Sequence, residues 1–395
     1  MGASFSIARL PRVEAGPGAI AKAPSICARF GRRMLLVTGA HSFGASVHHE
    51  RLAAALRKDG FAWETLAVDG EPSPELVDAA VRAHRAAGIE VVLGIGGGSA
   101  LDAAKAIAGL LKTGGPVLDH LEGVGRDVPY RGPSVPYVAV PTTAGTGSEA
   151  TKNAVLSTRG KGGFKKSFRD EQLVPQDAIL DPDLLASCPP ALIAADGMDA
   201  LTQLLEAYVS AKASPFTDAF AEGGMRAARD GLVEWYERGA AAGAARASMQ
   251  WAAYASGVVL AHAGLGAVHG LASPLGAFFP APHGAVCGTL VAAATEANVN
   301  AMLSHDPSNA ALKKYAAAGR LLASRPGLDD AAARKALVEW LYDLTDRLKL
   351  PRLGTFGISA NDLPGVVAHC RGGSMKTNPI VLTDEELTAV LTERL

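Results

Sequence analysis

Asp199 and Gln203 lie four residues apart in the stretch DALTQLLEAY, residues 199–208. In a helix, side chains at positions i and i+4 lie one above the other, so this carboxylate and this amide would point into the same space. A carboxylate can bind a divalent metal ion, whereas an amide can bind one only through its neutral carbonyl oxygen. Taken alone, the segment is more typical of an ordinary amphipathic helix than of half a metal site.

Two histidines in the segment VHGLASPLGAFFPAPHG, residues 268–284, are candidate partners for Asp199. His269 and His283 are each followed by glycine. A lone histidine is more often a hydrogen-bonded structural residue than a ligand. An aspartate with two neutral imidazoles is nevertheless a reasonable site for a borderline divalent ion. The residues alone leave both interpretations open.

A glycine-rich loop in GIGGGSALDAAKAIA, residues 94–108, joins a predicted strand to a predicted helix. Gly96, Gly97 and Gly98 allow close approach of the backbone, and the free N–H groups at a helix start suit a phosphate. The loop is neither a Walker A motif nor a standard GxGxxG pattern, because position 99 is serine. It predicts a diphosphate site, and the alternative is a tight turn capped by Ser99.

A second loop, PTTAGTGSEAT at residues 141–151, also follows a predicted strand. Its hydroxyls and amides could hold phosphate, ribose or nicotinamide groups, or could only bond to one another. Both loops would lie at the carboxyl ends of strands, where open α/β sheets bind their ligands. Together they favour a nucleotide.

The elements that must position these residues change type along the chain. The first half alternates strands and helices, which predicts a parallel sheet covered by helices. From about residue 186, long Ala- and Leu-rich segments predict helices. We therefore expect an α/β domain at residues 1–185 and an all-α domain at 186–395. The predicted strands are 34–39, 63–68, 91–99 and 136–143, and the predicted helices of the first half are 48–60 and 74–88.

Composition excludes several classes of protein. The chain has 395 residues, 48% of them apolar, and a net charge of −1, so nothing in its charge favours nucleic acid or an anionic membrane as partner. Its four cysteines are far apart and predict neither disulfides nor a zinc finger. No signal-peptide pattern and no long apolar run is present, so we expect a cytoplasmic protein.

In this order, the motifs resemble the iron-containing (group III) alcohol dehydrogenase family over nearly the whole chain. That resemblance implies a Rossmann-like N-terminal domain for NAD or NADP and a helical domain for a divalent metal, iron or zinc, in a dehydroquinate synthase-like architecture. It also implies a homodimer. The motifs are GPGAI (16–20), GGGSALDAAKAIA, PTTAGTGSEAT, residues 165–185, GMDALTQLLEAYVS, the HG and PHG pairs, and NP (378–379).

The resemblance implies a role for particular residues of this chain. Gly97, Gly98 and Ser99 would contact the diphosphate, and Gly96 and Gly39 would belong to the same coenzyme site. The nicotinamide half would be contacted by Asp102, Thr142, Thr143, Ser148 and Lys165. The metal ligands would be Asp199, Gln203, His269 and His283.

Three residues depart from the family pattern. Gln203 replaces a histidine ligand, so the metal would bind more loosely, or Gln203 would hold a metal-bound water, or the site would be metal-free as in maleylacetate reductases. Ser273 replaces a histidine of the proton relay, so proton exchange would run through the ribose, Ser273 and water. Gly39 replaces an aspartate that binds the ribose 2′-hydroxyl, which makes NADP(H) plausible.

These inferences predict an NAD(P)-dependent oxidoreductase that interconverts a small alcohol and its aldehyde or ketone, with the metal polarising the substrate oxygen. The alternatives are a metal-independent reductase and a non-catalytic nucleotide-binding protein. Arg371, Ser374 and Lys376 indicate an anionic substrate, unless they form only a solvated basic loop.

Overall fold

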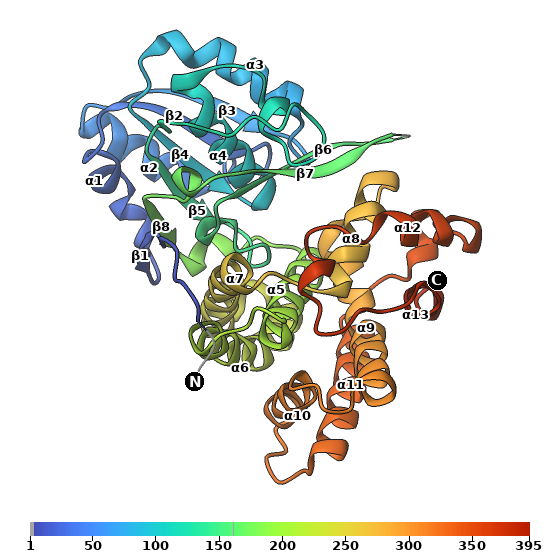
Figure 1. Cartoon of the computed structure of the whole chain (residues 1–395). Coiled ribbons are helices and arrows are strands. Elements are labelled where there is room, and N and C mark those ends of the chain that lie inside the picture. Colours follow the sequence, from blue (N-terminus) through green and yellow to red (C-terminus); the bar gives the residue numbers. More distant parts are fainter. Residues whose placement is uncertain (1–3, 161) are drawn as a thin grey trace.

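The parallel sheet predicted for the first half of the chain is present in the computed structural model, which describes residues 4–160 and 162–395. Six parallel strands lie in the order β1-β8-β5-β4-β2-β3 (Figure 1). The four predicted strands correspond to β2, β3, β4 and β5. The bounds are β1 Arg12–Ala15, β2 Arg33–Gly39, β3 Ala62–Val68, β4 Val91–Gly96, β5 Tyr137–Pro141 and β8 Asp177–Leu180.

Helices cover this sheet, and their first residues follow from the sequence. Ser46 accepts a hydrogen bond from a backbone N–H of α2, and Ser73 does the same for α3, which has Pro74 at its first position. α4 begins at the glycine loop and is buried along most of its length, because it is alanine- and leucine-rich on all sides. The bounds are α1 Ala23–Cys27, α2 Val47–Lys58, α3 Pro74–His84 and α4 Gly98–Thr113.

An antiparallel hairpin interrupts the α/β pattern. β6 (Asn153–Thr158) pairs with β7 (Phe164–Arg169), and β7 packs against the helical part of the chain at α8. Figure 1 shows the hairpin projecting from the sheet toward α8. The hairpin was not predicted as strands, although its second strand lies in one of the motifs that carry the resemblance.

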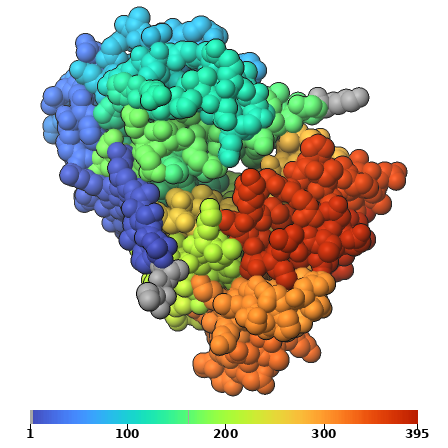
Figure 2. Space-filling view, in the orientation of Figure 1, coloured from blue at the N-terminus to red at the C-terminus, as the bar shows by residue number. Residues whose placement is uncertain are grey.

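The helical part begins at Pro190, a few residues after the change of type predicted at about residue 186. α5 is almost entirely buried and packs against α6, α7 and α9. Figure 2 shows the surface hollowed between the α/β part and the helices near the C-terminus. The bounds are α5 Pro190–Val209, α6 Pro215–Arg238, α7 Gly243–Ala263, α8 Ala267–Phe278, α9 His283–His305, α10 Ala311–Leu322, α11 Asp330–Arg347, α12 Leu363–His369 and α13 Asp384–Glu393.

Across the described ranges, no single helix is long and apolar enough to cross a membrane; α7 and α8, bent by 100°, meet the length and composition only as a pair.

Candidate metal centre and coenzyme cleft

Three helices bring together the aspartate and the two histidines that the sequence singled out. Asp199 lies on α5, His269 on α8 and His283 at the first residue of α9. Nε2 of His269 lies 3.2 Å from Oδ1 of Asp199, and Nε2 of His283 lies 3.9 Å from the same oxygen. The residues alone left this grouping open and the family resemblance implied it; the structure brings the three side chains together, with Asp199 and His269 buried and His283 partly buried.

Glu206 orients the imidazole of His269 through Nδ1, the ring nitrogen that does not face Asp199. One oxygen of Glu206 lies 2.6 Å from Nδ1 of His269, and the other accepts from the backbone N–H of Val268 at 2.7 Å. With Nδ1 donating to this carboxylate, Nε2 faces Asp199, as in the carboxylate–histidine pairs of metal sites. Glu206 was not predicted as a site residue, although it lies seven residues after Asp199 and therefore on the same helix face.

Gln203 holds Asp199 and does not present its carbonyl oxygen to the cluster. Its Nε2 donates to Oδ2 of Asp199 at 2.9 Å, while its Oε1 accepts from the hydroxyl of Ser256 at 2.8 Å. A carbonyl oxygen is the only atom with which this side chain can bind a metal. The geometry favours a positioning role for Gln203, and its assignment as a direct ligand stays a prediction.

A fourth candidate ligand, Cys287, was missed. Its sulfur lies 3.7 Å from Nε2 of His269 and 3.7 Å from Nε2 of His283. One ligand atom from each of Asp199, His269, His283 and Cys287 lies within 4.8 Å of the others. A buried carboxylate, two imidazoles and a thiol form a chemically suitable donor set for a borderline divalent ion.

The charges of the cluster suit a cation. Burial would raise the pKa of Asp199, but His283 and His269 lower it to about 2. Burial lowers the pKa of His283 to about 4, so its imidazole is neutral at pH 7. Burial would also lower the pKa of His269, but Cys287 and Glu206 raise it well above its ordinary value. A divalent ion on Nε2 would replace the proton that Asp199 otherwise attracts there.

The glycine loop lies where β4 meets α4. Gly97 caps α4 without a side-chain hydrogen bond, so backbone N–H groups at this helix start are free of a capping side chain. A Cβ on Gly98 would lie 2.7 Å from Cγ2 of Thr146, in the second loop. The two loops therefore pack together, as their predicted positions at the carboxyl ends of β4 and β5 required.

Four of the predicted coenzyme residues also belong to internal contacts. Asp102 accepts from the hydroxyl of Ser148 at 2.5 Å and from the backbone N–H of Val155 at 3.1 Å. The backbone N–H of Thr142 donates to the carbonyl of Gly96 at 2.9 Å. These bonds hold the second loop and β6 against α4 and β4, and direct coenzyme contacts by these residues stay predictions.

The second loop also packs against α5, one turn before Asp199 of the candidate metal cluster. A Cβ on Gly145 would lie 2.7 Å from Cβ of Asp196, which is one turn before Asp199 on α5. Thr143 is a hydrogen-bond partner of Asp196, whose pKa is raised to about 7, mainly by burial. The loop predicted to hold the coenzyme is thus packed directly against the helix that carries the first metal ligand.

The remaining predicted residues lie around this cleft. Lys165 of β7 forms an ion pair with Glu71 at 2.7 Å, and its charge acts on His283. Ser273 follows His269 by one turn on α8 and is partly buried. Gly39 ends β2, with open space around the position of a Cβ.

Arg371 does not face an open anion pocket. Its guanidinium pairs with Asp384 and donates to the carbonyl of Leu382. Lys376 is exposed, and Ser374 is partly buried in the same segment. The pairing favours the solvated-loop interpretation for Arg371.

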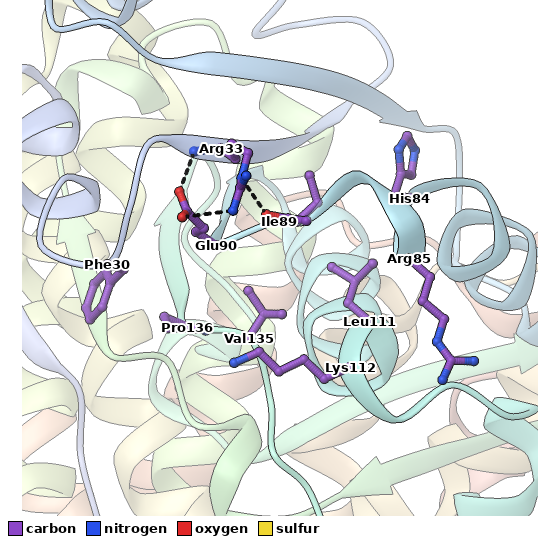
Figure 3. Close-up of a pocket in the computed structure, with 11 residues that line it drawn as sticks. Phe30, Arg33, His84, Arg85, Ile89, Glu90, Leu111, Lys112, Val135 and Pro136 are labelled. Atoms are coloured by element: carbon purple, nitrogen blue, oxygen red, sulfur yellow. Dashed lines mark hydrogen bonds and ion pairs between the residues drawn. The ribbon is translucent and has the colours of Figure 1, made fainter.

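A separate hollow of about 490 Å³ lies at the other edge of the sheet, near the amino ends of β2, β4 and β5 (Figure 3). Arg33 within it is hydrogen-bonded to Glu90. Because the glycine loops occupy the carboxyl ends of the strands, this hollow is not part of the candidate site.

Two family models match consecutive parts of the chain, and both describe the same family. Residues 11–182 match the family described as iron-containing alcohol dehydrogenase, and residues 193–395 match the C-terminal family of the Fe-containing alcohol dehydrogenases. The chain belongs to the iron-containing alcohol dehydrogenase family.

Individual relatives agree with this family in sequence and fold. Alcohol dehydrogenase 4 of Saccharomyces cerevisiae is 34% identical over 325 residues, covering 81% of this chain and 80% of the relative. The crystal structure of a 1,3-propanediol oxidoreductase superposes with a TM-score of 0.90 at 27% identity, covering 100% of both chains. That of sulfoacetaldehyde reductase from Bifidobacterium kashiwanohense, in complex with NAD⁺, gives 0.86 at 25% identity and covers 100% of this chain and 99% of the other.

As in metal sites with a supporting carboxylate, Glu206 should strengthen metal binding by this alcohol dehydrogenase. Glu206→Gln leaves one acceptor oxygen for the two bonds that Glu206 now accepts, so we expect zinc affinity to fall by about 10- to 100-fold. Competition with a chromophoric chelator measures this. Glu222→Gln on α6, which removes a carboxylate bonded to Tyr208, is the matched control. A loss smaller than about threefold would contradict the assigned role.

Gly98→Ala should weaken coenzyme binding. The added methyl would overlap Thr146 and push the two loops apart. Overpacking of this kind costs about 1–3 kcal/mol, which corresponds to roughly 5- to 150-fold in the dissociation constant of NAD(H). Fluorescence titration with NADH tests this. Gly223→Ala on α6 is the control, since its Cβ would meet open space; equal affinities for both variants would show that the loop contact is irrelevant to the coenzyme.

Proposed function

We propose that this alcohol dehydrogenase interconverts a small alcohol and its aldehyde or ketone, with a divalent metal at Asp199, His269 and His283 and with NAD(H) or NADP(H) in the adjoining cleft. The observation that carries the proposal is the packing of the second loop against α5 beside Asp199, at Gly145 and Asp196. This packing brings the predicted coenzyme site next to the metal cluster. A carboxylate, two imidazoles and a dinucleotide site together support hydride transfer at a polarised carbon–oxygen bond.

When bound, the ion supplies a Lewis acid for the substrate oxygen, and the nicotinamide carries the hydride. Residues of the chain hold the metal-binding side chains in fixed orientations. Glu206 fixes the ring of His269, and Gln203 fixes the second oxygen of Asp199. The hydroxyl of Ser273, one turn from His269, passes the alcohol proton toward water and cannot store it near neutral pH.

Metal removal separates this function from its alternatives. We expect a purified sample loaded with zinc or iron to reduce small aldehydes with NADH or NADPH, and to lose that activity after exhaustive chelation. Unchanged turnover after chelation would favour a metal-independent reductase. Coenzyme binding without turnover on a broad panel of alcohols and aldehydes would favour a non-catalytic nucleotide-binding protein.

Gly39 bears on the choice between NAD(H) and NADP(H). Gly39→Asp places a carboxylate at the end of β2, where open space accepts it. Such a carboxylate accepts from a ribose 2′-hydroxyl and repels a 2′-phosphate, so we expect the NADP-to-NAD ratio of kcat/KM to fall by about tenfold or more. Steady-state kinetics with both coenzymes measures this. Gly223→Asp adds the same charge on α6 as a control, and an unchanged ratio in Gly39→Asp would place the ribose elsewhere.

We also propose that the substrate is a small neutral or anionic molecule and that the protein is a cytoplasmic homodimer. For the substrate, the one feature of the sequence that indicated an anion is weakened by the pairing of Arg371 with Asp384. The homodimer is supported by family membership alone, and analytical ultracentrifugation tests it.

A further inference from the structure

The metal cluster contains a thiol that the family resemblance did not lead us to expect. Cys287 is fully buried and lies four residues after His283 on α9, so both side chains project from the same face of that helix. Its sulfur is equidistant, at 3.7 Å, from the Nε2 atoms of His269 and His283. Cys287 therefore lies where a ligand to the same ion would lie.

Gln203, which replaces the family histidine, makes hydrogen bonds that occupy both ends of its amide. Gln203 donates to Asp199 and accepts from Ser256, and both bonds are buried. The orientation that makes both bonds turns the carbonyl oxygen away from Asp199. Turning the amide over would set that oxygen against a carboxylate oxygen 2.9 Å away and would lose the bond to Asp199.

Four separations among the remaining groups are close to those of a shell of four protein ligands, to which the substrate oxygen would add as a fifth ligand. Bonds of about 2.0 Å to nitrogen or oxygen and about 2.3 Å to sulfur set neighbouring ligand atoms about 3.3–3.6 Å apart. The corresponding separations here are 3.2 Å for His269 to Asp199, 3.7 Å for each histidine to Cys287, and 3.9 Å for His283 to Asp199. Small side-chain adjustments would close this set around an ion.

We propose that Cys287 is the fourth protein ligand, so that the centre consists of Asp199, His269, His283 and Cys287, and Gln203 only positions Asp199. Binding transfers the thiol proton to solvent and leaves a thiolate on the ion. Thiolate and imidazole together favour zinc over iron, because thiolate is a soft ligand. This inference rests on the metal-dependent function proposed above.

X-ray absorption of the zinc-loaded wild-type protein tests the ligand directly. We expect one sulfur scatterer at about 2.3 Å in addition to nitrogen and oxygen at about 2.0–2.2 Å. A zinc shell of nitrogen and oxygen alone, in a sample that retains metal-dependent turnover, would overturn the assignment of Cys287 while leaving the proposed function intact. Failure to bind any divalent ion, with turnover unaffected by chelation, would overturn both.

Cobalt-loaded variants provide a second readout that does not depend on activity. The wild type should show a thiolate-to-cobalt charge-transfer absorption that Cys287→Ser lacks. Cys370→Ser removes a buried thiol bonded to the carbonyl of Val367, outside the site, and should keep the absorption. Gln203→Ala should keep it as well; its loss in Gln203→Ala but not in Cys287→Ser would overturn the proposal. Circular dichroism confirms that each variant is folded.

Discussion

Replacing Asp199 by asparagine should lower kcat/KM for aldehyde reduction by about a thousandfold or more. The ion contributes several kcal/mol of charge stabilisation in the transition state, and each 1.36 kcal/mol is a factor of ten in rate. Asparagine has the same shape and can still accept the bond from Gln203, but it has no negative charge to offer the ion. The loss should therefore appear as a low metal content in a folded protein, which mass spectrometry and circular dichroism measure together.

Asp343→Asn, an exposed substitution on α11, is the matched control and should leave both metal content and turnover unchanged. Full metal occupancy in Asp199→Asn, with kcat/KM within about threefold of the wild type, would refute the central role of this carboxylate. Low occupancy with normal turnover would instead support a metal-independent reductase.

Asp199, His269 and His283 could be singled out because their residue types suit a metal ion, but only the family resemblance grouped them as a predicted ligand set. An aspartate on an apolar helix and two His–Gly pairs separated by prolines restrict the chemistry before any distance is known. The sheet could be predicted for a similar reason, since β4 and β5 are uninterrupted apolar strands that end in glycine- and threonine-rich loops. Local pattern was sufficient for the sheet, whereas the predicted ligand set also needed the family resemblance.

The ligand environment could not be predicted, because it depends on contacts between distant segments. The orientation of Gln203 is decided by Ser256 on α7, and the role of Glu206 is decided by His269 on α8. To predict Cys287 as a candidate ligand, one would have needed to know the first residue of α9. The residues around PAPHG resemble a loop, yet His283 is already the first helical residue, and only that start places Cys287 one turn above it.

The hairpin and the buried ion pair of α4 were missed for a related reason. LDAAKAIA reads as an apolar helix with two charged residues, which usually face solvent. Here the second loop and the start of β6 pack over α4 and cover both charges, so Asp102 is mostly buried and Lys105 is completely buried. From the sequence alone, these two charges could not be assigned to a buried ion pair, because the segment that covers them was not known.

Lys105 holds the second loop and the start of β6 in place. The three N–H groups of its ammonium are shared among four oxygens, the carbonyl and hydroxyl of Ser148, the hydroxyl of Thr151 and the carbonyl of Asn153, at 2.7–3.1 Å. Burial lowers its pKa to about 8, against the opposing charges of Asp102 and Glu149, so the amine still carries its proton at neutral pH. The charge of Lys105 therefore compensates the buried carboxylate of Asp102, 4.0 Å away, while its N–H groups bond to the loop.

Lys105→Met should consequently destabilise the fold by about 3–5 kcal/mol, the usual cost of leaving one partner of a buried charge pair uncompensated. Methionine fills a similar volume, so the loss reflects the missing charge and hydrogen bonds rather than a cavity. Urea unfolding at pH 7 measures it, and Lys112→Met on the exposed face of the same helix should change the free energy of unfolding by no more than about 0.5 kcal/mol. Because Lys105 fixes Ser148 and, through it, Asp102, the loss should extend to coenzyme affinity. Equal stabilities of the two variants would mean that the loop beside Asp199 is held by its packing on α5 and α7 alone.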